Sequence, residues 1–394
     1  MPQMKLKADR IFNGFKWLDK HQVLIADKQG RIMDIIPESE AGDDVISLKG
    51  TLCPGFVNAH GHLELSHLKD RMERGTGLTG FLLQVIKQRG FDPELIRDAM
   101  IQADKDMYQD GIQAMGDICN TSDSIPIKAS SRIRWYNFIE VLSSRDEGWE
   151  QRLAHFTALR DQFRQAFSQH PHGSMAITAS LAPHAPYSVS PKSFQAINQA
   201  TKEETTSLHS QESKAEDELF RHGTGPFLEF YRSIGLPGNP VTPSGTSSLR
   251  AVLPYFHGHQ RVVLVHNTYT TAEDLIFADR LADERGLSIH YCLCPNANLF
   301  IEGVMPPIPL LMEEERKIVI GTDSMASNDG LSISSEIKTI LRAYPTIPLE
   351  RILKWATSNG AAALGFENQL GSFTPGTAPG ILLLDDQLAV QRIC

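Results

Sequence analysis

The sequence predicts an α/β fold, a (β/α)8 barrel joined to a small β domain drawn from both ends of the chain. Three observations predict it. Over most of the chain, short apolar runs alternate with longer segments of helical periodicity, as in repeated βα units. Eight such units span about 310 residues, which fits a barrel with insertions because ~250 residues are typical. Segments of β character at each end stand outside this alternation, so we expect them to pair into one small sheet.

The first fifty residues are typical of short β-strands. Val23–Ile25 and Arg31–Ile36 flank a turn at Lys28–Gly30, and two β runs around a short glycine-containing turn indicate a hairpin. The alternation of apolar and helical segments begins only after Pro54 and Gly55.

The barrel strands are predicted from apolar runs that are bounded by polar or turn residues. The eight runs are Phe56–Ala59, Ile112–Ile118, Ile133–Val141, Met175–Leu181, Thr205–Leu208, Val262–Val265, Leu287–Cys292 and Lys317–Ile320. Helical periodicity between these runs predicts helices that include Phe81–Arg89, Pro93–Asp110, Asp146–Gln169 and Ala272–Arg285.

The far end of the chain returns to β character. A stretch rich in glycine and proline runs from Leu364 to Gly380, and Ile381–Leu384 then predicts one more strand. We expect residues 1–53 and 371–394 to form the composite β domain and residues 54–370 to form the barrel.

The composition indicates a folded cytoplasmic protein. Of the 394 residues, 41% are hydrophobic and 22% are charged, which is enough apolar material for a sizeable core. The 38 basic and 47 acidic residues give a net charge of −9 with no basic block, which argues against nucleic acid as a partner. The region from Met1 to Lys20 carries charge throughout, so we expect neither a signal peptide nor a membrane partner. A homodimer is left open.

The cysteines do not predict a disulfide framework. The chain has five, scattered over its length: Cys53, Cys119, Cys292, Cys294 and Cys394. An odd, scattered set fits a reducing compartment.

Histidine pairs of the form H-x-H occur three times, at His60–His62, His170–His172 and His257–His259. The pattern by itself is weak evidence for metal binding, so its position in the predicted fold decides. His60 and His62 directly follow the run Phe56–Ala59, at the carboxyl end of a strand, where functional side chains of a barrel converge. The other two pairs precede strands, which predicts surface positions at the opposite mouth of the barrel.

Three further strands end in groups that can bind metal or move protons, namely His209, His266 and Asp323. Imidazoles together with a carboxylate suit a divalent ion such as Zn²⁺ or Fe²⁺, with room for a water molecule. Such an ion lowers the pKa of bound water and supplies hydroxide. Glu212 lies three residues after His209 and could carry protons in the same pocket; the alternative is a solvated glutamate in a charged run.

Short motifs are spread over nearly the whole chain: Pro54–His62, Pro183–Tyr187, His209–Glu212, His266, Cys294–Asn298, Gly321–Asn328 and Ala356–Ala361. In this order they resemble the amidohydrolase superfamily, in its mononuclear metal-dependent deaminase and chlorohydrolase branch. The resemblance implies a TIM-like barrel with a small β-sandwich built from both chain termini.

The resemblance also implies roles for individual side chains. The implied metal ligands are His60, His62, His209 and Asp323. His266 would orient or deprotonate the metal-bound water with Asp323 sharing the proton, Glu212 would protonate a ring nitrogen and the leaving amine, and His184 and Ser327 would contact substrate. Two-metal members bridge their ions with a carboxylated lysine near the end of the fourth strand. The stretch Ala179–His184 contains no lysine, which favours a single ion, Zn or Fe.

The implied function is a hydrolase acting on carbon–nitrogen bonds other than peptide bonds, specifically a cyclic amidine deaminase. Metal-bound hydroxide would attack an amino-purine or nucleoside-like heterocycle, adenosine-type or 6-aminodeoxyfutalosine, and ammonia would leave. Glu212 favours deamination over dechlorination, because an amine needs a proton to leave and chloride does not. Alternatives are a chlorohydrolase acting on a triazine-like ring, a cytosine or guanine deaminase, and a non-catalytic scaffold, which the complete ligand set disfavours.

The residues after the first histidine pair bear on the substrate. Leu63–Ser66 reads Leu-Glu-Leu-Ser, which resembles the 6-aminodeoxyfutalosine deaminases. Glu64 and Ser66 could then form hydrogen bonds to hydroxyl groups of a small-molecule substrate; the alternative is that both side chains brace the loop.

Overall fold

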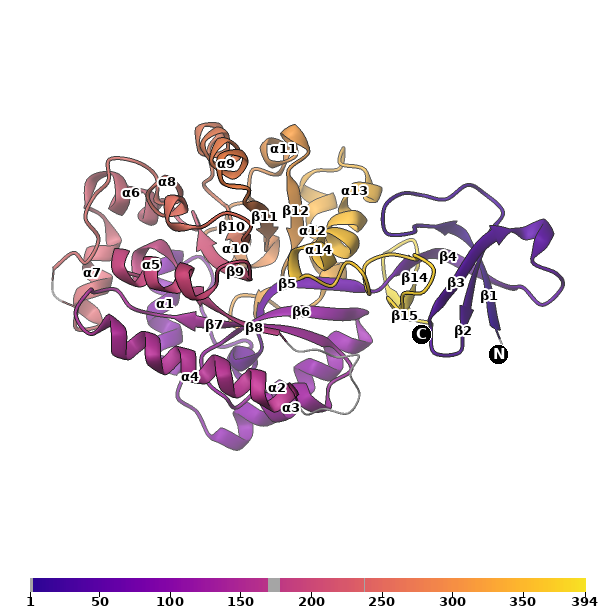
Figure 1. Ribbon diagram of the computed structural model, residues 1–394, viewed down its shortest axis with the longest axis horizontal. Coiled ribbons are helices and arrows are strands. Elements are labelled where there is room, and N and C mark those ends of the chain that lie inside the picture. The colour runs from indigo at the N-terminus through magenta and orange to yellow at the C-terminus, as the bar shows by residue number, and fades with distance from the viewer. Residues whose placement is uncertain (1–2, 169–177, 237) are drawn as a thin grey trace.

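Two parallel β-sheets form the centre of the protein in the computed structural model, which describes residues 3–168, 178–236 and 238–394 (Figure 1). One sheet has five strands in the order β13-β5-β6-β7-β8 and the other has four in the order β12-β11-β10-β9. Their bounds are β5 Phe56–His62, β6 Ile112–Cys119, β7 Arg134–Val141, β8 Thr178–Pro183, β9 Thr205–Ser210, β10 Arg261–His266, β11 Ser288–Leu293, β12 Lys317–Ile320 and β13 Asp323–Ser324. Each of the eight predicted apolar runs contributes to one of β5 to β12, although the part of the fourth run before Thr178 lies outside the described residues.

Hydrogen bonds link the outer strands of the two sheets. Between β8 and β9, the hydroxyl of Thr206 donates to the carbonyl oxygen of Leu181 at 3.0 Å. Just beyond β8, the carbonyl oxygen of His184 accepts the backbone N–H of His209 at 3.0 Å. On the other side, the N–H of Thr322 after β12 donates to the carbonyl oxygen of His60 in β5 at 2.9 Å. The predicted α/β fold with parallel strands is therefore confirmed, while full closure of the barrel stays a prediction.

Helices cover the outside of these sheets (Figure 1). They are α1 Gly77–Gln88, α2 Pro93–Gln109, α3 Ile125–Ser130, α4 Trp149–Ser168, α5 Pro191–Ala200, α6 Lys214–His222, α7 Pro226–Ser233, α8 Ser248–Val252, α9 Ala272–Arg285, α10 Pro295–Ile301, α11 Ile308–Leu311, α12 Ile333–Ala343, α13 Leu349–Lys354 and α14 Gly360–Leu364. Local sequence sets the bounds of α9, where Thr271 and Asp274 form a reciprocal capping box and Gly286 ends the helix at a φ of 68°. Of the helices in the described ranges, none has the length and apolar character needed to cross a membrane.

The chain ends pair as expected. Their strands are β1 Gln3–Ile11, β2 Gln22–Asp27, β3 Ile32–Pro37, β4 Ile46–Pro54, β14 Ile381–Leu384 and β15 Val390–Arg392, in one six-stranded sheet of order β15-β14-β4-β1-β2-β3. The predicted hairpin is β2 with β3, and β14 pairs antiparallel with β4 so that Ile381 faces Pro54 and Leu384 faces Thr51. This sheet stands to one side of the two parallel sheets with both termini on it (Figure 1). The two-layered sandwich stays a prediction.

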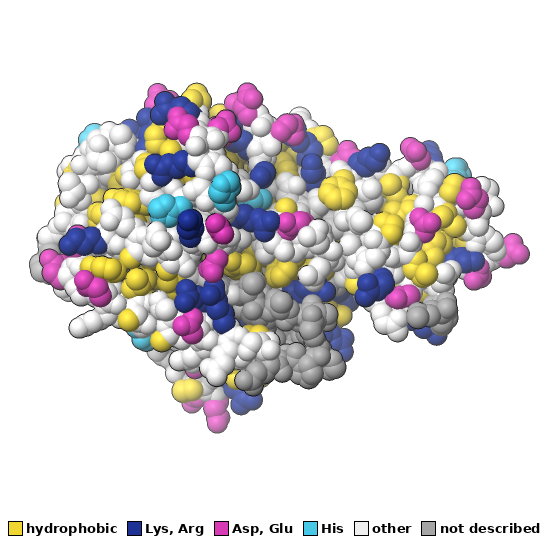
Figure 2. Space-filling model, in the orientation of Figure 1, with side chains coloured by type: hydrophobic (Ala, Val, Ile, Leu, Met, Phe, Trp, Pro, Cys, Tyr) yellow, Lys and Arg dark blue, Asp and Glu magenta, His cyan; other side chains and the backbone are white. Residues whose placement is uncertain are grey.

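On the face seen in Figure 2, basic and acidic side chains are interspersed rather than gathered by sign. All five cysteines are free thiols, and only Cys394 is not fully buried.

Candidate active site

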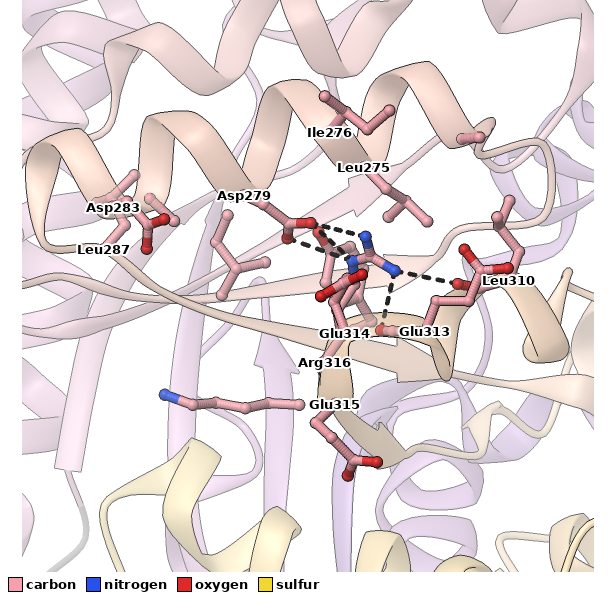
Figure 3. Close-up of a pocket in the computed structure, with 15 residues that line it drawn as sticks. Leu275, Ile276, Asp279, Asp283, Leu287, Leu310, Glu313, Glu314, Glu315 and Arg316 are labelled. Atoms are coloured by element: carbon pink, nitrogen blue, oxygen red, sulfur yellow. Dashed lines mark hydrogen bonds and ion pairs between the residues drawn. The ribbon is translucent and has the colours of Figure 1, made fainter.

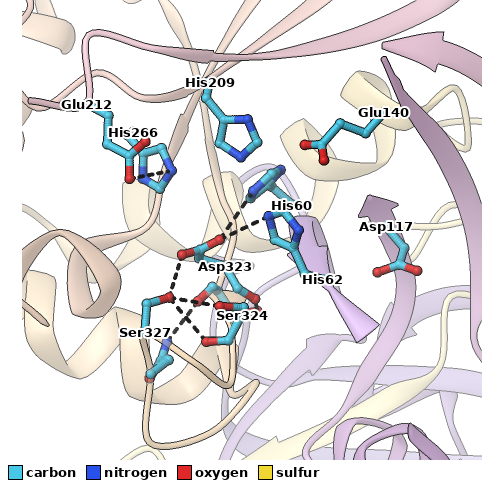
Figure 4. A network of polar contacts seen from close by, with 12 residues as sticks. His60, His62, Asp117, Glu140, His209, Glu212, His266, Asp323, Ser324 and Ser327 are labelled. Atoms are coloured by element: carbon cyan, nitrogen blue, oxygen red, sulfur yellow. Dashed lines mark hydrogen bonds and ion pairs between the residues drawn. The ribbon is translucent and has the colours of Figure 1, made fainter. Parts of the chain in front are cut away.

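The strand-end histidines and Asp323 converge in one place (Figure 4). His60 and His62 come from β5, His209 from β9 and His266 from β10, while Asp323 lies in the two-residue strand β13 beside β5. One ligand atom each of His60, His209, His266 and Asp323 lies within 4.8 Å of the others. His62 is close too, since its Nε2 is 3.2 Å from Oδ1 of Asp323. The structure therefore brings together every residue expected to bind metal.

The glycine between the paired histidines allows this approach. A Cβ atom on Gly61 would come within 2.4 Å of the Met115 side chain and 3.0 Å of the Asp323 carbonyl oxygen. Only glycine lets β5 lie this close to its neighbours, so the sequence His60-Gly61-His62 is suited to close packing as well as to metal ligation.

Backbone strain gathers at the same strand ends. Gln211, His266, Asn267 and Asp323 have φ values of 49°, 74°, 53° and 59°, in the left-handed region that non-glycine residues rarely adopt. Such conformations persist where surrounding contacts fix them, and they are typical of functional sites. Here they turn the chain sharply at the ends of β9 and β10 and at β13.

The ligand groups fit a divalent cation. His60 is fully buried, and neither of its ring nitrogens has a hydrogen-bond partner within the described ranges. Buried polar groups are almost always paired, so such a histidine indicates a missing ligand. Three or four imidazoles with one carboxylate form the donor set that zinc and iron accept.

Protonation states agree with this fit. Burial lowers the pKa of His60 to about 4, and burial together with neighbouring histidines holds the pKa of His209 well below its usual value. Burial opposes ionisation of Asp323, but the adjacent His60 and His62, whose Nε2 atoms lie 3.6 and 3.2 Å from its Oδ1, outweigh it and hold its pKa well below the ordinary range. These shifts favour neutral rings at His60 and His209 and an ionised carboxylate at Asp323, whereas at His62 burial is outweighed by Asp323, which raises the pKa.

Outer contacts orient the rings. His209 Nδ1 donates to the carbonyl oxygen of His184 at 2.7 Å, which leaves Nε2 facing the cluster. His266 Nδ1 lies 2.9 Å from Oδ1 of Asn298, whose amide nitrogen is used elsewhere, so Nδ1 is the donor and Nε2 is unprotonated. The hydroxyl of Ser327 donates to Oδ2 of Asp323 at 2.5 Å. Such contacts fix tautomer and orientation in metal sites.

Glu212 is buried rather than solvated, with 5% of its surface exposed. Its Oε1 lies 3.5 Å from Nε2 of His266. Burial, followed by the nearby carboxylates of Asp323 and Glu216, raises its pKa well above the usual value, which favours the protonated carboxyl group. Glu216 also positions it, because the N–H of Glu212 donates to Glu216 Oε2 at 3.1 Å.

His184 borders an apolar pocket. Its Nδ1 lies 2.6 Å from the hydroxyl of Ser188, and it helps to line a cavity of about 420 Å³ with Tyr187, Leu142, Phe230 and other side chains. The cavity therefore begins beside the histidine cluster, next to His209, whose ring centroid is 4.9 Å from that of His184.

Glu64 and Ser66 contact the protein itself. The Glu64 carboxylate accepts the N–H groups of Asn120 and Thr121, both at 3.1 Å, and the Ser66 hydroxyl donates to the carbonyl oxygen of Leu63 at 2.7 Å. These bonds brace the loop after β5, the alternative foreseen from the sequence. Contact with substrate stays a prediction for both.

The other histidine pairs lie apart from the cluster. His257–His259 precedes β10, and His259 is exposed. His170–His172 lies outside the described residues.

A second cavity, of about 740 Å³, lies beside α9 and β12 (Figure 3). Its Arg316 is already bound to Asp279 at 2.7 Å and to the carbonyl oxygens of Leu310 and Glu313. Among the described residues, no histidine or cysteine lines this cavity, whereas His184 lines the cavity of about 420 Å³.

A buried ion pair supports the backbone directly after His62. Lys128 in α3 lies 2.5 Å from Oδ2 of Asp117 in β6, and both side chains are fully buried. Oδ1 of Asp117 accepts the N–H of Leu63, the residue directly after His62, at 2.8 Å. Sequence reasoning missed this pair, although Lys128 could have drawn attention to it, since the other residues of the short stretch Ile125–Ala129 are apolar.

Replacing Lys128 with methionine should destabilise the protein by about 3–5 kcal/mol, because Asp117 would stay buried without its partner. Urea denaturation measures this loss. The double variant Lys128→Met/Asp117→Asn should recover part of the stability, since it buries no unpaired charge. A single variant within about 0.5 kcal/mol of the natural protein would show that the pair contributes little.

Comparison with known proteins decides the family. The model of the amidohydrolase family matches residues 51–392. The chain belongs to the amidohydrolase family. The resemblance inferred from the motifs is confirmed, and with it the assignment as a hydrolase of carbon–nitrogen bonds.

Relatives within the amidohydrolase family carry deaminase names. A 5-methylthioadenosine/S-adenosylhomocysteine deaminase from Teredinibacter turnerae is 27% identical over 390 residues, covering 93% of this chain and 81% of the relative. An aminodeoxyfutalosine deaminase from Nitratiruptor is 28% identical over 345 residues, covering 85% and 78%. The crystal structure of Helicobacter pylori aminofutalosine deaminase with methylthio-coformycin superposes with a TM-score of 0.82 at 22% identity, covering 97% of this chain and 92% of that one. That likeness confirms the fold.

Proposed function

We propose that this amidohydrolase deaminates an amino-purine or nucleoside-like heterocycle and releases ammonia. One observation carries the proposal: a buried Glu212, whose raised pKa favours the protonated form, lies beside the histidine and aspartate cluster, where it can deliver a proton to a leaving amine. The names of the two sequence relatives, deaminases of adenosine-type or aminodeoxyfutalosine substrates, support the substrate class.

His60, His62, His209 and Asp323 would hold one divalent ion, zinc or iron, and the position of His266 among the close ligand atoms makes it a neighbour of that ion. The chemistry that a bound divalent ion supplies here is activation of water at neutral pH.

Side chains of this protein would transfer the protons that the deamination requires. Hydrolytic deamination takes up one water and releases one ammonia, so no proton is gained or lost overall. The unprotonated Nε2 of His266, with Asp323, takes the proton that water gives up. The carboxyl of Glu212 would first protonate the ring nitrogen next to the attacked carbon. As the carbon–nitrogen bond breaks, Glu212 would take the proton of the newly attached hydroxyl group and give it to the departing amine, and the proton held by His266 would then return to Glu212, 3.5 Å away. His184 and Ser327 are proposed to contact the substrate, with Ser327 also holding Asp323.

The proposal includes three further expectations from the sequence. Residues 54–370 would form a closed barrel, which hydrogen bonds at both outer edges of the two sheets support. Residues 1–53 and 371–394 would form the composite β-sandwich, supported by their shared sheet. The free thiols support a cytoplasmic location.

We expect metal-loaded protein to release ammonia from one member of a panel containing 6-aminodeoxyfutalosine, adenosine, S-adenosylhomocysteine, guanine and cytosine. A coupled ammonia assay measures this, and chelation of the metal should abolish it. Chloride release from a chlorotriazine, with silence across the amine panel, would replace deamination by the chlorohydrolase alternative.

A further inference from the structure

Glu140 is a buried carboxylate that the proposed mechanism does not use. It lies near the carboxyl end of β7, and its side chain is 6% exposed. Asn120 donates its amide N–H to Oε2 at 2.8 Å, but Oε1 has no hydrogen-bond partner in the described part of the chain. Figure 4 shows the carboxylate pointing toward His209. A buried carboxylate oxygen without a donor is costly, so this one indicates a bound group that supplies the donor.

His184 places a second acceptor beside it. The Ser188 hydroxyl donates to the carbonyl oxygen of Ala185 at 3.1 Å, so it accepts from Nδ1 of His184 at 2.6 Å. The neutral ring then leaves Nε2 unprotonated, 3.9 Å from Oε1 of Glu140. Oε1 of Glu140 and Nε2 of His184 are therefore two neighbouring hydrogen-bond acceptors.

The position of this pair connects two parts of the site. Ligand atoms of Glu140 and His184 lie within 4.8 Å of that of His209, which belongs to the metal-ligating cluster, and His184 also lines the apolar cavity of about 420 Å³. A ligand whose reacting carbon lies at the cluster and whose far end enters the cavity must pass the pair. Asn120, which holds Glu140, is itself held by Arg89 at 2.6 Å, so the carboxylate is fixed in place.

We infer that Glu140 and His184 select substrates that carry two adjacent hydrogen-bond donors, as in a sugar diol, between the reacting ring and an apolar extension. Glu140 is thus a specificity-determining residue, and the inference rests on the proposed function. A hydrogen bond to a buried charged group is strong, so loss of the charge should change affinity for the diol by about 10–100-fold.

The test compares a nucleoside that the enzyme accepts with its 2′,3′-dideoxy analogue, on metal-loaded natural protein and on Glu140→Gln. We expect the natural protein to prefer the diol by about 10–100-fold in kcat/KM, and Glu140→Gln to lose most of that preference through KM with kcat and metal content unchanged. Glu273→Gln, the same change at an exposed position on α9, should keep the preference. Equal discrimination by Glu140→Gln and the natural protein would overturn the inference.

Calorimetric binding of the same two nucleosides separates this inference from the proposed function. A diol preference in binding that Glu140→Gln loses, without ammonia release by any variant, would reject deamination and keep the role of Glu140. Absence of any diol preference in binding would overturn that role. A fall in metal content by one equivalent in Glu140→Gln would instead show that Glu140, His184 and His209 bind a second cation, and it too would overturn the inference.

Discussion

Glu212→Gln should lower the rate of deamination by about 10²–10⁴-fold while the protein keeps its metal. The amide has the shape of the carboxyl group but has no acidic proton to give to a ring nitrogen or a leaving amine. Glu212 is not one of the four proposed metal ligands, His60, His62, His209 and Asp323, so metal retention should be unchanged. Ammonia release and metal analysis on the same preparation measure both effects.

A matched substrate sharpens this prediction. A 6-chloropurine analogue needs no proton on its leaving group, so its hydrolysis by Glu212→Gln should fall less than ammonia release does. Near-normal ammonia release by the variant would remove Glu212 from the mechanism.

The second large effect is expected from His209→Ala, which should abolish metal retention and with it the activity. The His209 ring is central, with centroids of His60, His184 and His266 at 4.9, 4.9 and 5.5 Å. Asp323→Ala should behave in the same way, because its carboxylate is the anionic member of the cluster. Metal content after dialysis is the measurement.

His259→Ala is the control for this effect. His259 belongs to an H-x-H pair as well, but it is exposed and lies before β10 rather than at the carboxyl end of a strand. It should retain metal and activity. If His259→Ala were as damaging as His209→Ala, the strand-end rule that selected the site would be wrong.

That rule worked because parallel strands covered on both faces are nearly continuous apolar runs, which stand out in a sequence. β12 was predicted with its observed bounds, Lys317–Ile320, and so was α9, Ala272–Arg285. Once the strands were placed, their carboxyl ends selected His209, His266 and Asp323 without knowledge of side-chain positions. Other bounds shifted by a few residues, as in α4, which begins at Trp149 rather than Asp146.

Contacts that depend on three-dimensional proximity were not predictable in this way. Asn298 orients His266 across 32 residues, and Asp117 supports Leu63 across 54. β13 has two residues, too few for any periodicity, and its pairing with β5 depends on the turn at Asp323. Glu140 offered a usable signal, since it is an acidic residue near the end of the apolar run Ile133–Val141, and the strand-end rule would have selected it.

The sheet shared by both chain ends bears on how the protein is made. β4 emerges from the ribosome long before its neighbour β14, with residues 55–380 between them. At ~5–20 residues per second, roughly 330 residues of synthesis take about 20–60 s. During that interval one edge of β4 has free N–H and C=O groups, the kind of edge that recruits other strands. Newly made chains therefore pass through an aggregation-prone stage that ends only when the last strands arrive.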